Sequence, residues 1–415
     1  MTGFRAMVTG QLLTAETSRE GDRVTTLELF FDLVYVFAFT QVTQLMAHGH
    51  SAESVLQGLA VLALIWWSWT SFAWLTNQAH ADRGIVRVGI MLAIAIMFIV
   101  SLVIPESFDD LEGGLFAPMV FVVCITLVSI VHAVVYWIAA GADAALRRQI
   151  LRSVGITIVP VLALTTVGAL VGGPWQAWIW LGTALLQGVI IFVTSHGGDW
   201  RIYSMAHFSE RHGLIVILAL GESVVATGVG VAELAISVPI IIGSLFAITL
   251  AVAMWWNYFH HLSGGVEHAL QQREGRDRVD AATDVYTYLH PFVVAGIIIV
   301  ALGVEQSMHD VESPEAIGYF AAWALGGGLS LYLATTGFIW ARVSGQWSLL
   351  RFGAAVLALV LVPVIAEQIA LVALPILVVV SVLLAVLEEV LGPRAKVRRR
   401  PRPGTAAEAG IATAD

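Results

Sequence analysis

Charged residues are scarce in this chain. They make up 12% of its 415 residues, whereas hydrophobic residues make up 58%, and the mean hydropathy is +0.84. Soluble globular domains carry about 25% charged residues. The composition therefore excludes an ordinary soluble domain and is typical of an integral membrane protein.

Cysteine is almost absent, which excludes an intramolecular disulfide. The one cysteine, Cys124, lies in an apolar run, and we expect it to pack as a small hydrophobic side chain. The first 24 residues contain no short apolar core followed by a small-residue cleavage site. We therefore expect the first hydrophobic span to act as an uncleaved signal anchor.

Common catalytic and nucleotide-binding motifs are also missing. No GxGxxG, P-loop, HExxH or nucleophile-elbow pattern occurs, and SHGGDW at 195–200 lacks the strand and helix that phosphate binding needs. We therefore expect a protein that is not an enzyme and that binds no cofactor. An intramembrane enzyme, the remaining alternative, would need a nucleophile or a set of metal ligands.

Histidines flank the loop between the sixth and seventh of the hydrophobic spans described below and follow the eighth span, all on the side predicted to be cytoplasmic. Their spacing matches no zinc pattern, so we expect solvated loop side chains and no metal, with pH sensing as the alternative. These histidines are His196, His207, His212, His260, His261 and His268.

Long apolar runs predict twelve transmembrane helices. A hydrocarbon core of about 30 Å needs about 20 residues per crossing, and the last run, of about 40 residues, is long enough for two. We divide that run at Glu367 and Gln368. The predicted spans are 25–46, 54–76, 84–104, 115–140, 152–172, 174–195, 211–231, 236–259, 283–305, 316–341, 348–366 and 370–390.

Basic residues predict the orientation of these spans. All 21 Lys and Arg fall in the N-terminal segment, around alternate loops or in the C-terminal tail, whereas the loops at 105–114 and 305–315 are acidic. Because short basic loops stay in the cytoplasm, both termini are predicted to be cytoplasmic. The basic tail is predicted to be a disordered topology anchor near anionic lipid, and we expect no nucleic-acid partner.

The two halves of the chain resemble each other. ELFFDLVYVFAFTQ opens the first span and ERHGLIVILALGES the seventh, and tryptophan pairs at 66–67 and 255–256 follow in the next spans. Chance recurrence is the alternative. A repeat predicts an all-α, polytopic membrane fold with a cytoplasmic segment at 1–24, parallel six-helix repeats at 25–200 and 201–391, and a tail at 392–415. Transporters commonly bind their substrate between such halves.

Glu28 and Asp32 lie inside the first span. They are four residues apart and so share one helix face, and Asp32 is about 10 Å along the helix from Thr25. A carboxylate at that depth needs a partner, a proton or a wet cavity. Two interpretations stay open, a structural latch paired with arginine and the handling of an ion or proton.

Glu222 is a second buried acid, about 18 Å along the seventh span from Glu210. Arg211 shares its face but is predicted to lie too far away to touch it. We expect Asp32 and Glu222 to bind or relay a proton, cation or small solute. The other candidates are expected to form a cytoplasmic vestibule (Glu28, Glu210 and Arg211) or to help to ligate (Gln41). The candidate site residues are Asp32, Glu222, Glu28, Gln41, Glu210 and Arg211. Further polar groups that could complete the site are Gln44, Gln187, Asn257, Asp284, Glu367 and Gln368.

The segments ELFFDLVYVFAFTQ and HFSERHGLIVILALGES resemble the bacterial low temperature requirement protein A family, and the resemblance extends over about residues 20–390. It implies a multi-pass bacterial plasma-membrane protein named for growth in the cold, and its name establishes no biochemical activity. We therefore carry two hypotheses, a transport protein and a non-transporting scaffold or cold-adaptation protein with structural carboxylates. The residues that carry the pattern are Glu28, Phe31, Asp32, Glu210, Arg211, Gly213, Gly221 and Glu222.

Overall fold

The computed structural model describes residues 23–195 and 202–391. The predicted N-terminal segment up to residue 22, His196 and the tail at 392–415 lie outside these ranges. Within them no β-strand occurs, and the all-α prediction is confirmed. The helices are α2 (Thr26–Gly49), α3 (Ala52–Gln78), α4 (Gly84–Val103), η1 (Ile104–Glu106), α5 (Ala117–Ala139), α6 (Ala144–Val171), α7 (Gly173–Ser195), α8 (Met205–Gly230), α9 (Val238–Tyr258), η2 (Phe259–Ser263), α10 (Gly264–Gln271), α11 (Gly275–Ala282), η3 (Thr283–Leu289), α12 (His290–His309), α13 (Gly318–Ser344), α14 (Leu349–Val360), α15 (Val362–Ala366) and α16 (Ala370–Leu391).

Twelve helical segments of the described ranges are long and apolar enough to cross a membrane, as predicted. The division of the last apolar run is also confirmed, because α15 ends at Ala366 and α16 begins at Ala370. The turn between them is held in place by Gln368, whose carbonyl accepts a hydrogen bond from the Ile317 amide at 2.9 Å. The chain is therefore a multi-pass membrane protein.

Several helices extend beyond the predicted spans. The eighth runs from Val238 to Gln271 and the ninth from Gly275 to His309, and they include the π-helical turns η2 and η3. The loop predicted at 260–282 is therefore too long, because only residues 272–274 are non-helical, and its histidines lie in helices. Hydropathy reports only the part of a helix that lies in lipid, so it misses polar turns that continue the helix into water.

The fifth span shows the same difference at its start. Helix α6 begins at Ala144, so the arginines at 147, 148 and 152 lie in its first turns and not in the preceding loop. Asp143 caps the helix by accepting hydrogen bonds from the Ala145 and Leu146 amides, both at 3.0 Å. This cap fixes a start eight residues earlier than hydropathy predicts.

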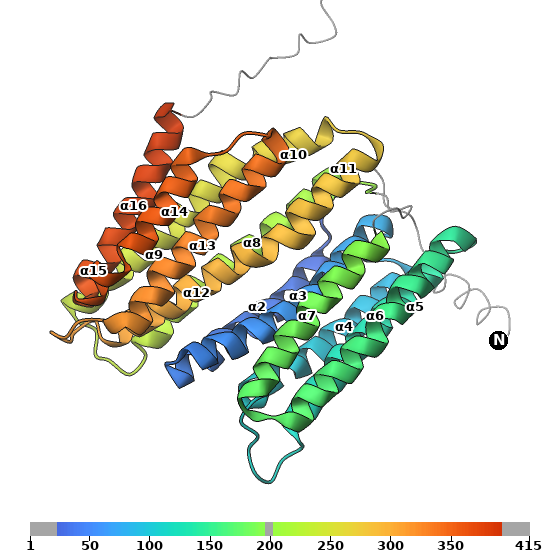
Figure 1. The fold of residues 1–415 in the computed structure, drawn as a ribbon, viewed down its shortest axis with the longest axis horizontal. Helices are drawn as coiled ribbons and strands as arrows, with labels where there is room; N and C mark the ends of the chain where they lie inside the picture. The colour runs from blue at the N-terminus through green and yellow to red at the C-terminus, as the bar shows by residue number, and fades with distance from the viewer. Residues whose placement is uncertain (1–22, 196–201, 392–415) are drawn as a thin grey trace, which may run out of the picture.

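The helices form two neighbouring groups, α2–α7 and α8–α16 (Figure 1). The groups meet where α2 and α3 contact α8 and α12. Candidate site residues from the first and seventh spans are thereby brought to the same interface. The repeat relation between the halves, the domain boundaries and the cytoplasmic termini stay predictions.

Helices α12 and α13 approach each other at two glycines. A Cβ atom added to Gly296 would lie 2.7 Å from the Tyr332 amide nitrogen, and one added to Gly328 would lie 2.8 Å from the Val300 amide nitrogen. No side chain fits at either position. These glycines hold α12 close to α13 and so position the face of α12 that meets α2 and α8.

Candidate functional site

A buried ionic cluster joins α2 to α8; it consists of Glu28 and Asp32 on α2 and His207 and Arg211 on α8. Arg211 Nη1 lies 3.0 Å from Glu28 Oε1, and Arg211 Nη2 donates to Asp32 Oδ1 at 2.8 Å. His207 Nε2 lies 3.1 Å from Glu28 Oε1. All four side chains are buried, the most exposed at 4%. Asp32, Glu28 and Arg211 are thus brought together as candidate residues, while His207 is new.

Neighbouring elements orient this cluster. Trp69 on α3 donates its indole N–H to Asp32 Oδ1 at 2.8 Å, and its ring lies 5.7 Å from the Arg211 guanidinium carbon. Glu28 also begins α2, because its carboxylate accepts the Thr25 amide at 2.8 Å and Thr25 caps the Glu28 amide in return. These contacts fit the arginine-paired latch more closely than a mobile ion site.

The cluster still has unused hydrogen-bonding atoms. Among the described residues, Asp32 Oδ2, His207 Nδ1 and Arg211 Nε have no hydrogen-bond partner. Two carboxylates also face a single guanidinium. Buried polar atoms of this kind usually find a partner such as an ordered water. The cluster can therefore accept a water molecule or a proton without being taken apart.

The sequence expectation for two histidines is wrong. His207 and His212 were predicted to be solvated loop side chains, but both lie in α8 and are buried. His212 packs among the rings of Trp69, Phe208 and Tyr286, at centroid distances of 5.0, 4.6 and 4.6 Å. One signal could have identified His207, since it precedes Arg211 by four residues just as Glu28 precedes Asp32.

A second polar group lies farther along the same interface; we call Glu222 on α8 and Glu305 on α12 the carboxylate pair. Glu222 accepts a hydrogen bond from Thr40 Oγ1 at 2.6 Å. Glu305 accepts from Gln44 Nε2 at 3.2 Å. The two residues are 1% and 7% exposed, and the side chains that bind them, Thr40 and Gln44, are about one turn apart on α2.

Each acid of the carboxylate pair accepts its described side-chain hydrogen bond from a neutral group. Within residues 23–195 and 202–391, neither Glu222 nor Glu305 forms an ion pair with Lys or Arg. The nearest arginine on the same helix, Arg211, is eleven residues from Glu222, or about 16 Å. The prediction that it does not touch Glu222 agrees with this geometry.

The ionic cluster and the carboxylate pair lie toward opposite ends of the α2–α8 contact. Arg211 is six residues from the start of α8, about 9 Å, and Glu222 is eight residues from its end, about 12 Å. Buried side chains separate them, among them Tyr35, whose hydroxyl bonds to Ser68 on α3 at 2.7 Å. Polar groups therefore occur at both depths of one helix interface.

Two of the predicted residues lie outside both groups. Gln41 is half-buried and has no described hydrogen bond to either carboxylate, whereas Gln44, three residues on, binds Glu305. Glu210 is exposed, and its carboxylate accepts the Val24 amide at 3.4 Å. The predicted vestibule of Glu28, Glu210 and Arg211 is thus divided into a closed cluster and a surface side chain.

A separate cavity of about 160 Å³ lies between α3, α5, α6, α7 and the segment 279–288. None of the six predicted site residues lines it, but Gln187 and Asp284 do. Its wall contains aromatic rings, including Trp67 and Phe72, and His132, whose buried Nε2 has no partner among the described residues. The cavity receives side chains from both groups of helices.

Most of the chain is similar to proteins of one known family. Residues 23–386 match the family described as bacterial low temperature requirement A protein (LtrA). An uncharacterized protein of Rhizobium meliloti (strain 1021) is 26% identical over 320 residues, which is 74% of this chain and 75% of that protein. No solved structure matches significantly. Because the family match spans most of its length and includes the acid-bearing helices α2, α8 and α12, the chain belongs to the bacterial LtrA family.

Proposed function

We propose that this protein is a transport protein of the bacterial plasma (inner) membrane, which carries a proton or a monovalent cation past Glu222 and Glu305. One observation carries the proposal: these two buried carboxylates, on different helices, are held only by neutral donors among the described residues. Helices α2, α8 and α12 supply this site at the junction of the two helix groups.

The energetics favour binding of positive charge at the carboxylate pair. Placing an ionised carboxylate at depth in a membrane costs about 2.5–3.5 kcal/mol on insertion scales, and more in some estimates. A proton or a cation removes that cost, and the second carboxylate strengthens the attraction. Moving one such charge across the membrane gains or costs about 2.3 kcal/mol per 100 mV, so a membrane potential can drive the process.

The ionic cluster has a different part in this proposal. Arg211 forms ion pairs with both Glu28 and Asp32, so each acid already has a cationic partner and the cluster positions α2 against α8. Asp32 keeps one unbonded oxygen for a water or a proton. We therefore assign ion binding to the carboxylate pair and positioning to the ionic cluster, with Asp32 Oδ2 as a further atom that can accept a proton.

Flux measurements on proteoliposomes test the proposal. Proton entry is followed with an internal pH-sensitive dye, and sodium and rubidium entry with isotopes, under an imposed potential. We expect uptake of at least one of these ions, and at least a tenfold slower uptake for Glu222→Gln and for Glu305→Gln. Glu53→Gln is the matched control, because Glu53 is exposed in the first turn of α3.

Two results would contradict the proposal. The first is wild-type uptake no faster than in protein-free vesicles for all three ions. The second is uptake that both glutamine variants leave unchanged. Circular dichroism of each variant in detergent shows whether the helices are retained, so a lost fold is distinguished from a lost site.

A non-transporting scaffold is the second candidate, and the ionic cluster is the observation that favours it. Its contacts resemble a latch that fixes α2 to α8. A scaffold predicts that neutral variants of all the buried acids lower the thermal unfolding midpoint and that no ion moves. Transport predicts instead that Glu222→Gln stops flux while its hydrogen bond from Thr40 and its stability are retained.

The cavity offers a place for a small solute that moves with the ion. Its mixture of aromatic rings and hydroxyl groups suits a small amphipathic molecule. We expect that a solute that raises the unfolding midpoint of the wild type gives no shift with Ser129→Phe, which fills the cavity, and a normal shift with Ser129→Ala. A solute that stabilises all three proteins equally binds elsewhere.

A further inference from the structure

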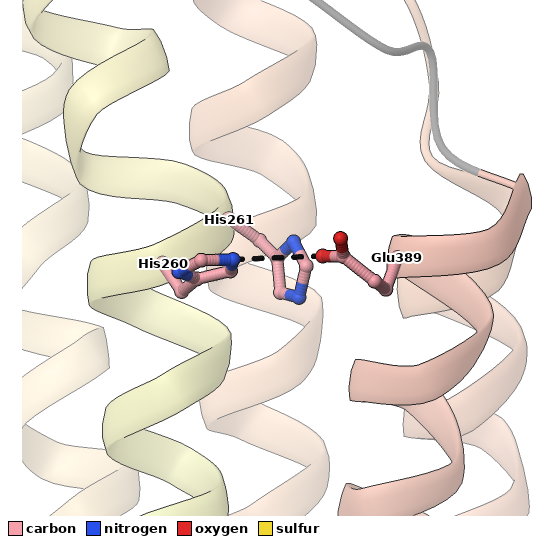
Figure 2. Close-up of side chains that lie close together, drawn as sticks. All are labelled: His260, His261 and Glu389. Carbon is pink, nitrogen blue, oxygen red and sulfur yellow. Dashed lines mark ion pairs between the residues drawn. The ribbon is translucent and has the colours of Figure 1, made fainter.

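Two adjacent histidines and a glutamate lie close together at the end of α9, outside the site described above. His260 and His261 belong to the π-helical turn η2, and Glu389 reaches them from α16 (Figure 2). One ligand atom from each residue lies within 4.8 Å of the others. His260 Nε2 is 3.5 Å from Glu389 Oε2.

The local backbone and its neighbours orient the two rings. The centroids of His260 and His261 are 4.9 Å apart and their planes are nearly perpendicular, at 88°. Trp256, one turn earlier, lies against His260 with a centroid distance of 4.6 Å. Single π-helical turns within α-helices occur frequently at functional sites, because they change which side chains share a face.

The surrounding charges leave the Glu389 carboxylate available. The neighbouring Glu388 is engaged by Arg351, with Nε to Oε1 at 2.7 Å and Nη2 to Oε2 at 2.9 Å. Glu389 has no arginine or lysine partner among the described residues. His261 Nε2 is buried and has no described hydrogen-bond partner. One buried imidazole nitrogen thus lacks the partner that such groups usually have, and the only ion pair of Glu389 among the described residues is with His260.

We propose that His260, His261 and Glu389 form a binding site for a divalent transition-metal ion of the Zn²⁺ type. Two imidazole nitrogens and one carboxylate oxygen form the donor set that suits zinc, iron, cobalt or nickel, whereas Mg²⁺ and Ca²⁺ prefer oxygen ligands. Three protein ligands leave a fourth position for water or for an exchanging group.

The geometry needs only a small closure around the ion. Zinc binds at about 2.0–2.2 Å from nitrogen and oxygen ligands, so tetrahedral donors lie about 3.4 Å apart. The His260–Glu389 separation of 3.5 Å already meets this condition. His260 and Glu389 are exposed and His261 is half-buried, so an ion can enter from water and the side chains can adjust.

Isothermal titration of the full-length, tag-free protein with Zn²⁺ tests this site. We expect one ion per chain, and an affinity lowered at least tenfold by His260→Ala, by His261→Ala and by Glu389→Gln. His268→Ala is the matched control, because His268 lies on α10 and is bonded to Gln272 instead. Titration with Mg²⁺ is expected to give no binding.

Thermal unfolding gives a second readout that does not depend on flux. Zn²⁺ is expected to raise the unfolding midpoint of the wild type by tying η2 to α16, and to leave that of His260→Ala unchanged. The proposal is overturned if wild type binds no Zn²⁺, if the three site variants bind as tightly as wild type, or if His268→Ala weakens binding equally. The last result would show adventitious binding by surface histidines.

Discussion

Arg211 provides the positive charge that faces the two buried carboxylates at the α2–α8 contact. Its guanidinium is buried and faces the two carboxylates of α2, while the Trp69 ring lies beside it. Breaking a buried ion pair by removing one partner leaves an uncompensated charge, which costs more than the intact pair contributes. Among the residues of this cluster, we therefore expect replacement of Arg211 to lower the free energy of unfolding most.

We expect Arg211→Met to lower the free energy of unfolding by about 3–5 kcal/mol, because Glu28 and Asp32 then lose their cationic partner. Thermal unfolding in detergent micelles measures this effect. Adding Glu28→Gln and Asp32→Asn should recover part of the loss, since the uncompensated charges are then removed. Arg87→Met is the control, because Arg87 is exposed on α4. If Arg211→Met alone were as stable as wild type, the pairing of Arg211 with Glu28 and Asp32 would not contribute to stability.

At the level of elements, the contact between α12 and α13 leaves no room for a side chain at the glycines that face it, of which Gly328 is one. A side chain at Gly328 meets the Val300 backbone, whereas one at the adjacent Gly327 meets only a Trp323 ring carbon at 3.5 Å, an ordinary contact distance. Overpacking of this kind typically costs about 1–3 kcal/mol. Neighbouring positions on one helix therefore differ sharply in what they tolerate.

We expect Gly328→Val to destabilise the protein by about 1–3 kcal/mol and Gly327→Val to change its stability by much less. The unfolding midpoints of both variants in detergent, compared with wild type, provide the measurement. The same substitution on the same helix controls for the intrinsic helix propensity of valine. Equal midpoints for the two variants would show that α12 and α13 do not approach so closely.

The spans could be predicted from sequence because each apolar run reports its own length. The division at Glu367 and Gln368 was found in this way. The helix ends could not be predicted, because polar turns such as η2 are helical for reasons other than hydropathy. His207 and His260 were therefore assigned to loops, although one is in the ionic cluster and the other faces Glu389.

Glu28, Asp32 and Glu222 could be predicted as site residues because burying a carboxylate is costly in any fold. Glu305 could not, because hydropathy assigned it to the acidic loop at 305–315, whereas it lies in α12. The partners of the acids could not be predicted either, because pairing depends on how α2 and α8 are rotated against each other. Arg211 was expected in an open vestibule and lies in a closed cluster. Gln41 was expected to ligate, but Gln44, about one turn along α2, is the residue that reaches Glu305.

At the scale of the whole molecule, the single cysteine allows the orientation in the membrane to be tested. Replacing buried Cys124 with alanine gives a background without cysteine. Glu53, after the first span, and Glu112, after the third, are exposed positions on the side predicted to be outside the cell. Gln346, after the tenth span, is an exposed position on the side predicted to be cytoplasmic. Each can carry one introduced cysteine.

We expect a membrane-impermeant maleimide to label Glu53→Cys and Glu112→Cys in intact cells, and Gln346→Cys only after the membrane is permeabilised. The reason is the positive-inside rule, which places the arginine-rich ends in the cytoplasm. Labelling is measured by the shift in mobility that a large maleimide causes. The reverse pattern would invert the whole topology, and a mixed pattern would contradict the count of twelve spans.

The interactions that join the two helix groups differ between the two ends of α8. Near the start of α8 the contact contains the ionic cluster, in which three ionic contacts join α2 to α8. Near the end of α8 the Thr40 hydroxyl and the Gln44 amide each bind one acid. The arginine end of the contact is therefore held by more and stronger interactions than the glutamate end. We expect any opening of the contact to begin at the glutamates, so that water would reach them first from the face predicted to be outside the cell.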